Sequence, residues 1–252
     1  MDNTFRDANR RSLPKRAIDK LRIVGIRRPA ARLLNVLDRA QLRLLVTTQG
    51  AYQPVLKHGH FEGADPRSCE ARWAVIEPHI PPDAKTAIDL GCAQGFFCLK
   101  LAGRGLTAIG VDSVGSIIDT AWRQARLNNL RGVGFINDDV SHEFVDRMPD
   151  VDVVIFFSLM HHLMYINDVE WCRELLRRLR PKVRKAMFFD MGQSNEPFHE
   201  WSALLPDMGA DPGAWLVQFL AENGFTESKV IGHVPADRMK DLNVKRAVIC
   251  AR

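Results

Sequence analysis

From Thr86 onward, short apolar runs alternate with longer stretches of helical periodicity, and this alternation restricts the possible fold more than any other feature. The runs have the length of buried strands. In chain order they are Thr86–Leu90, Ala108–Val111, Val133–Asn137, Asp152–Ser158 and Ala186–Asp190. The helical stretches that separate them are Gly95–Ala102, Ile117–Leu130, His142–Met148 and Val169–Leu179. Strands separated by helices predict an α/β fold with a doubly wound, mostly parallel sheet.

The end of the chain departs from this pattern. A last helix is predicted at Pro212–Asn223, and two strand-like runs then follow without a helix between them. These runs are Ser228–Val234 and Val244–Cys250. Strands that are joined directly pair in antiparallel fashion. We therefore expect a sheet of seven strands with an antiparallel hairpin at its C-terminal edge.

Positive charge is concentrated at the N-terminus. Residues 1–50 hold 12 Lys and Arg against 4 Asp and Glu, whereas residues 51–252 hold 23 against 26. One interpretation is an accessory segment that packs on the main domain or on a second subunit, as in a homo-oligomer. The other is an electrostatic contact for an anionic, phosphorylated or lipid-linked substrate, a nucleic acid or an anionic membrane surface. Clustered charge does not choose between them.

The N-terminal segment also has its own predicted secondary structure. Two helices are predicted, Leu13–Ile26 and Pro29–Thr48, and the Gly- and His-rich stretch 50–68 predicts a loop or lid. We divide the chain into a basic helical extension with its lid loop, residues 1–66, and a main domain, residues 67–252.

Composition excludes several classes of protein. With 46% hydrophobic and 26% charged residues, the chain has enough apolar side chains for a real core. Its apolar runs are far shorter than the ~20 residues of a membrane-spanning helix. The segment after Met1 lacks the apolar core of a secretory signal, so a cytoplasmic protein is expected. The five cysteines show neither zinc-site nor disulfide spacing and are expected to be reduced and mostly buried.

Ligands of doubly wound sheets bind where the strands end, so the loop after the first predicted strand is the expected ligand site. This loop reads Asp89-Leu90-Gly91-Cys92-Ala93-Gln94-Gly95-Phe96. A dinucleotide motif G-x-G-x-x-G would need glycine at positions 93 and 96, which hold alanine and phenylalanine. Asp89 would repel a pyrophosphate and suits a cationic ammonium or sulfonium group. The loop therefore disfavours a nicotinamide dinucleotide.

The loop resembles the first motif of class I S-adenosylmethionine-dependent methyltransferases, which runs acid-x-Gly-x-Gly/Ala-x-Gly. Asp89, Gly91, Ala93 and Gly95 match its positions, and the resemblance covers about residue 67 to the C-terminus. It implies a Rossmann-like methyltransferase domain at residues 67–252, with S-adenosylmethionine as the cofactor.

The ends of the next two strands fit the same resemblance. Asp112 ends the second strand, where a carboxylate would accept hydrogen bonds from both ribose hydroxyls. Asp138 and Asp139 end the third strand, where this family places an acid near the adenine amino group. Asp139, which precedes apolar Val140, fits that position better than Asp138.

The fourth strand leads into Ser158-Leu159-Met160-His161-His162-Leu163, which is similar to a turn in many family members. The resemblance places Ser158 at the cofactor and His162 beside the sulfonium methyl group. A neutral imidazole there would take a proton from an attacking hydroxyl. We name His162 as the candidate base and His161 as its neighbour in the catalytic set. A purely structural role for the histidine is an equal alternative.

Asp190 ends the fifth strand at the same edge as His162. The two side chains would form a base–carboxylate pair, or would bind a divalent metal such as magnesium. The alternative, which we favour over a metal site, is that Asp190 caps a turn before Gly192. The segment that follows, Gly192–Trp201, is polar with two aromatic residues and is expected to contact the acceptor. It loosely resembles methyltransferases that cap bacterial glycans.

The acceptor class is approached by exclusion. The chain lacks the Asn/Asp-Pro-Pro-aromatic turn of adenine amino methylation and the Pro-Cys pair of pyrimidine carbon methylation. An O-methyltransferase that acts on a sugar, a glycan or another small-molecule hydroxyl remains the first hypothesis. An RNA or tRNA methyltransferase whose basic arm binds phosphates is the alternative, although the arm lacks aromatic residues for base stacking apart from Phe5. A non-catalytic cofactor-binding module is the third.

Overall fold

The computed structural model describes residues 36–42, 44, 52–196, 199–236 and 244–252. The chain divides into two compact units, residues 1–44 and 45–252. In the first unit, residues 36–42 and 44 are helical and belong to the predicted helix at 29–48. The helix predicted at 13–26 lies outside the described residues.

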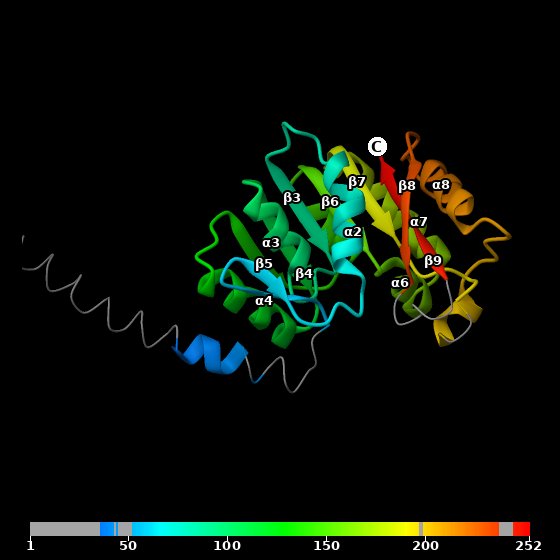
Figure 1. Cartoon of the computed structure of the whole chain (residues 1–252). Helices are drawn as coiled ribbons and strands as arrows, with labels where there is room; N and C mark the ends of the chain where they lie inside the picture. The colour runs from blue at the N-terminus through cyan, green and yellow to red at the C-terminus, as the bar shows by residue number, and fades with distance from the viewer. Residues whose placement is uncertain (1–35, 43, 45–51, 197–198, 237–243) are drawn as a thin grey trace, which may run out of the picture. The chain divides into compact units, whose positions relative to one another are not determined.

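The second unit is built on one seven-stranded sheet with the order β5-β4-β3-β6-β7-β9-β8. Strands β3 to β7 run parallel to one another, whereas β9 pairs antiparallel with both β7 and β8 (Figure 1). The fold class predicted from the alternation of strands and helices, with its antiparallel C-terminal hairpin, is confirmed. The strands are β3 (Thr86–Leu90), β4 (Thr107–Asp112), β5 (Val133–Asn137), β6 (Val151–Phe157), β7 (Val183–Asp190), β8 (Lys229–Pro235) and β9 (Lys245–Ala251).

Helices cover both faces of the sheet. One core packs α2 (Cys69–Ile76), α3 (Phe96–Gly103) and α4 (Gly115–Leu127) on one face. The other core packs α5 (His142–Arg147), α6 (Met160–Ile166), α7 (Val169–Leu179) and α8 (Pro212–Glu222) on the other face (Figure 1). Because alternate side chains of a strand point to opposite faces, β6 supplies Val154 and Phe156 to one core and Val153, Ile155 and Phe157 to the other. This double burial explains why the central strands have continuous apolar runs.

The stretch predicted as a loop at 50–68 contains a small antiparallel hairpin. Its strands are β1 (Val55–Lys57) and β2 (His60–Glu62), joined by His58 and Gly59. Both turn residues have positive φ, +50° and +85°, which is the backbone of a two-residue hairpin turn. Strands of three residues are too short to show a period, so the turn residues dominated the sequence pattern.

The remaining sequence expectations concern cysteines and membrane spans. All five cysteines are free and buried, as predicted. Within the part of the chain that the structure describes, no helix has the length and apolar character needed to cross a bilayer. A short helix, α6, follows β6 where the sequence predicted only a turn.

Candidate active site

The loop between β3 and α3 has a backbone that its small residues make possible. Gly91, Ala93 and Gly95 have φ values of +79°, +47° and +87°, all in the left-handed region. A Cβ on Gly95 would lie 2.7 Å from Cε1 of Phe135, so glycine is needed there for both conformation and space. A Cβ on Gly91 would lie 3.1 Å from Cδ2 of Leu159. The glycine positions of the motif therefore let the loop pass closely under neighbouring side chains.

Asp112 at the end of β4 stabilises this loop. Its Oδ2 accepts a hydrogen bond of 3.0 Å from the amide of Ala93, and its Oδ1 accepts one of 3.0 Å from the amide of Val114. Each carboxylate oxygen can accept a second hydrogen bond. The carboxylate therefore shapes the loop and still has acceptor capacity on the side of the adjoining cavity.

Two neighbouring cavities open at this edge of the sheet. The first, of about 250 Å³, is lined by the β3–α3 loop, by Asp89 and by residues of α2 and of the segment that precedes it. The second, of about 410 Å³, is lined by Asp139, by α6 and by the start of α7. Both are lined by Gly91, Asp112, Leu159 and His162. Most of the predicted site residues line one or both of these cavities, namely Asp89, Gly91, Ala93, Asp112, Asp139, Ser158 and His162.

Asp89 provides the electrostatic character of the first cavity. The side chain is 2% exposed. Burial, together with the charge of Asp112, raises the pKa of Asp89 to about 8. Arg67 and Arg72 line the same cavity. The carboxyl group of Asp89 and the guanidinium of Arg67 around one space match the ammonium and carboxylate of a bound amino acid, whereas the Arg72 guanidinium is paired with Asp190.

The two acids after β5 occupy different environments. Asp139 lines the second cavity. Asp138 accepts a hydrogen bond of 2.9 Å from the amide of Asp139, and its other oxygen lies 3.5 Å from Nη2 of Arg147. The geometry therefore favours Asp139 as the contact to a ligand in this cavity and gives Asp138 a local structural role.

The two adjacent histidines face different surroundings. His162 is exposed and lines both cavities. His161 is 2% exposed, and its Nδ1 accepts a hydrogen bond of 3.0 Å from the amide of Gly192. Burial, and then the neighbouring His162 and Arg246, lower the pKa of His161 well below its ordinary value. This geometry favours a structural role for His161, because its ring is buried and holds the backbone after β7, and the catalytic role stays a prediction.

Asp190 also differs from its predicted role. Its side chain is fully buried, forms an ion pair with Arg72 and accepts hydrogen bonds of 2.8 and 3.2 Å from the amide and hydroxyl of Ser158. A carboxylate with these partners is not available as a base or as a metal ligand. Among the described residues, no group of three or more His, Cys, Asp or Glu side chains has the arrangement of a metal site.

The predicted acceptor segment contributes Trp201, which lies in the short helix η3 (Glu200–Leu204). A Cβ on Gly192 would lie 2.2 Å from the Trp201 ring, so this glycine makes room for the tryptophan. The ring of His199 stacks on Trp201 with centroids 4.7 Å apart, and the ring of His161 lies 4.4 Å from it. These rings form a compact cluster beside His162.

Sequence reasoning missed the residues that hold the hairpin segment against the β3–α3 loop. Gln53 is 5% exposed. Its side-chain Oε1 accepts a hydrogen bond from the backbone amide of Phe96 at the start of α3, and its backbone amide donates one to Oε1 of Gln94. Gln124 accepts from the amide of Leu56 at 2.7 Å. Single glutamines in polar stretches carry no sequence signal that separates them from solvated residues, so only the fold identifies them.

Comparison with known proteins agrees with this geometry. The profile of a family described as "Methyltransferase domain" matches residues 87–182, from β3 to the residue before β7. The chain contains a class I S-adenosylmethionine-dependent methyltransferase domain. The family resemblance predicted from the motifs is confirmed, and a domain of this family implies S-adenosylmethionine as the cofactor.

The methyltransferase domain is similar to that of the O-antigen chain terminator bifunctional methyltransferase/kinase WbdD of Escherichia coli. The two sequences are 30% identical over 172 residues, which are 62% of this chain and 23% of the relative. A solved structure of WbdD gives a TM-score of 0.71 at 26% identity, over 83% of this chain and 45% of that one. This chain thus spans about a quarter of the length of that curated relative.

A more distant structure supports the fold alone. Magnesium protoporphyrin IX methyltransferase from Synechocystis PCC 6803, solved with bound S-adenosylmethionine, gives a TM-score of 0.51 at 16% identity. The similarity covers 73% of this chain and 76% of that one. The two chains therefore share this fold.

Proposed function

We propose that this methyltransferase domain transfers a methyl group from S-adenosylmethionine to a hydroxyl of a saccharide or glycan, with His162 as the general base. The observation that supports this proposal most directly is the position of His162. Its exposed imidazole lines both cavities, next to the motif residues Gly91 and Asp112. A base at this point would reach a hydroxyl that enters from solvent.

The residues around the cavities fit the cofactor by their chemistry. Asp112 has acceptor capacity for the ribose hydroxyls, and Asp139 in the second cavity would accept from the adenine amino group. Asp89 and the nearby guanidinium of Arg67 would hold the ammonium and the carboxylate. When bound, the cofactor supplies an electrophilic methyl group on a positively charged sulfur.

The remaining tasks belong to the protein. Methyl transfer is an in-line displacement, so the protein must align donor and acceptor, exclude water and remove one proton. Leu159, Tyr52 and Gln53 line the first cavity and would exclude water from it. His162 would accept the hydroxyl proton at a ring nitrogen as the oxygen attacks. No metal is needed for any of these steps.

The acceptor class rests on the relative. The name of WbdD describes an O-antigen chain terminator, and O-antigen is a glycan. We extend this to a saccharide acceptor for the present chain. The basic N-terminal extension would contact an anionic or lipid-linked carrier of that saccharide, an anionic membrane surface or a second subunit. Residues 52–66 would act as the lid of the donor cavity, since Tyr52 and Gln53 line it.

A labelled-methyl assay tests the proposal. The protein is incubated with S-adenosylmethionine that carries a radioactive methyl group and with separate pools of glycans, small metabolites and RNA, each with magnesium or with EDTA. We expect label in the glycan pool, independent of EDTA. Label in RNA alone would overturn the glycan proposal and favour phosphate binding by the basic extension. Loss of label with EDTA would contradict the metal-free chemistry.

A further inference from the structure

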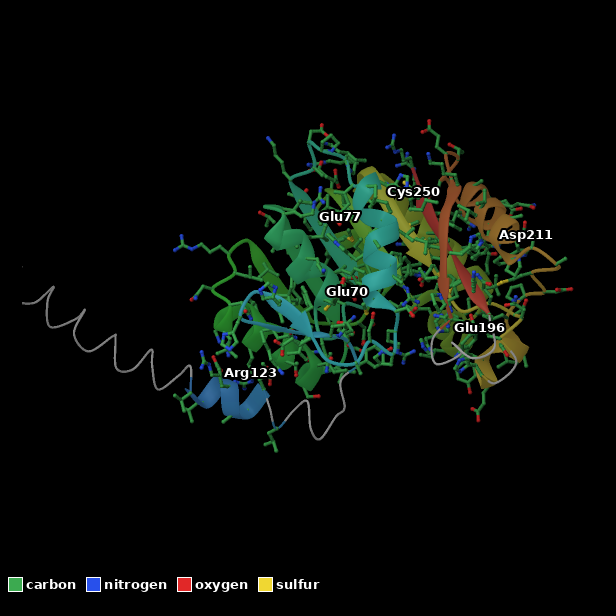
Figure 2. The ribbon with its side chains drawn as sticks, in the orientation of Figure 1. Glu70, Glu77, Arg123, Glu196, Asp211 and Cys250 are labelled. Carbon is green, nitrogen blue, oxygen red and sulfur yellow. The ribbon has the colours of Figure 1, made fainter. Side chains whose placement is uncertain are left out.

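Four charged side chains meet beneath Ser158 at the edge of the donor cavity. Arg72, Asp190, Glu196 and Arg246 are each at most 2% exposed. They come from α2, from the end of β7, from the loop after β7 and from β9, so they join segments that are far apart in the sequence. Figure 2 labels Glu196 beside β9, the strand that carries Arg246.

The Ser158 hydroxyl is the centre of this network. Its oxygen accepts hydrogen bonds of 3.0 Å from Nη2 of Arg72 and 2.9 Å from Nη1 of Arg246, and its proton is donated to Asp190 at 3.2 Å. A serine hydroxyl has one proton and two acceptor sites, so all three are in use. Ser158 also has a φ of +51°, a left-handed backbone that a residue with a Cβ adopts only when its surroundings hold it there.

Each guanidinium is neutralised by its own carboxylate. Arg246 forms two parallel hydrogen bonds of 2.7 and 2.8 Å with Glu196, and Arg72 pairs with Asp190. Buried ion pairs contribute little more to stability than apolar residues of the same volume would. Stability therefore does not account for this network, whereas placement of the Ser158 turn does.

The turn at residues 158–159 connects the network to the donor cavity. Ser158 and Arg72 line the first cavity, and the next residue, Leu159, lines both cavities and lies over Gly91. Arg246 is absent from the walls of both cavities, as the described residues define them. Its hydrogen bond to the Ser158 hydroxyl is a direct contact with a residue of the first cavity's wall, so an effect of Arg246 on a bound ligand can pass through Ser158.

We propose that Arg246, on the last strand of the sheet, is a positioning residue for the methyl donor: through the Ser158 hydroxyl it holds the turn at 158–159 against the β3–α3 loop. The proposal rests on the proposed function, because it takes the cavity to be the donor site. It adds a determinant that lies 88 residues along the chain from the turn on which it acts.

Calorimetric titration with S-adenosylhomocysteine tests this without knowledge of the acceptor. Arg246→Met alone would leave Glu196 as an unpaired buried charge, so the main variant is the double change Arg246→Met with Glu196→Gln, which keeps the interior neutral. We expect its thermal midpoint to stay close to that of the wild type while its Kd rises about tenfold. Ser158→Ala is expected to raise the Kd by a similar factor.

The combination of all three changes decides whether Arg246 acts through Ser158. If it does, the combined variant binds no more weakly than Ser158→Ala alone, because both changes remove the same constraint. Arg246→Lys, which keeps Glu196 paired, should raise the Kd by only about threefold. The matched control is Arg173→Met with Glu222→Gln, an exposed pair, which should leave the Kd unchanged.

Two results would overturn the proposal alone: a Kd within twofold of the wild type in the neutral double variant, or effects of Arg246 and Ser158 that multiply. Absence of binding to the wild-type chain would overturn the proposed function, and the positioning role with it. The two failures are therefore distinguishable.

Discussion

The donor side and the acceptor side of the site are built in different ways. The donor side, at the ends of β3, β4 and β5, consists of backbone turns and single carboxylates that lie a few residues after a strand. The acceptor side, at the ends of β6 and β7, consists of stacked rings, and the buried ion pairs around Ser158 join it to the wall of the first cavity. Local motifs thus specify the donor side, whereas contacts between distant segments specify the acceptor side. The predictions below test this contrast.

The largest expected effect concerns His162 on the acceptor side. His162→Ala should lower the rate of methyl transfer by about 10²–10⁴-fold, the usual contribution of a general base, with little change in stability. The labelled-methyl assay measures the rate. His233→Ala, an exposed histidine on β8, is the control and should retain full activity. Equal activity of the His162 and His233 variants would remove His162 from the mechanism.

The next effect concerns the tight packing of the donor loop. Gly95→Ala should destabilise the fold by about 2–4 kcal/mol, because it combines left-handed strain with an overlap onto Phe135. Urea denaturation measures this change. Gly105 has a similar φ of +89°, but a Cβ added there would have no atom within 4 Å, so Gly105→Ala should cost only about 1–2 kcal/mol. Equal losses in the two variants would show that Phe135 does not require a glycine.

A smaller effect distinguishes the acids of the donor side. Asp112→Ala should weaken S-adenosylhomocysteine binding by about 1.5–3 kcal/mol, because charge-assisted hydrogen bonds are lost and the loop amides lose their acceptor. Calorimetry gives the affinity. Asp138→Ala, which removes a partner of exposed Arg147, should leave the affinity nearly unchanged. A larger loss of affinity in Asp138→Ala than in Asp112→Ala would reassign the ribose contact to Asp138.

The smallest effect follows from the raised pKa of Asp89, which burial lifts to about 8. A cationic ammonium favours the ionised carboxylate, so S-adenosylhomocysteine binding should release protons below pH 8. In that range the binding free energy should become more favourable by up to about 1.4 kcal/mol for each unit by which the pH rises. Titrations in buffers of different ionisation enthalpy measure the proton release. Asp89→Asn should abolish it, and an unchanged proton release in that variant would assign it to another group.

The same shift affects the stability of the ligand-free protein. The folded-state pKa of Asp89 lies above its ordinary value of 3.8, so its contribution to stability is fully present below about pH 4 and is lost as the pH rises to about 8. Asp89→Asn should therefore raise the thermal midpoint more at pH 8 than at pH 5. An equal change at both values would contradict the raised pKa.

The sequence predicted the fold class and the donor loop because both depend on short-range patterns. Apolar runs of strand length, and an acid with glycines directly after one of them, have the same meaning wherever the chain places them. The same reasoning did not predict the buried partners of His161 and Asp190. Each follows a strand as a catalytic residue would, yet each is buried and bonded to a partner more than 30 residues away. Sequence spacing carries no information about such partners.

The sequence by itself determined the order of strands and helices, the glycines of the cofactor loop and the acids that follow three successive strands. Only the tertiary structure decided which of two adjacent histidines faces the cavities, and that Arg246 reaches Ser158 from the last strand. The physical reason is the distance along the chain between the residues that interact. Backbone conformation and strand periodicity are set within a few residues, whereas burial and ion pairing depend on which segments the folded sheet brings together.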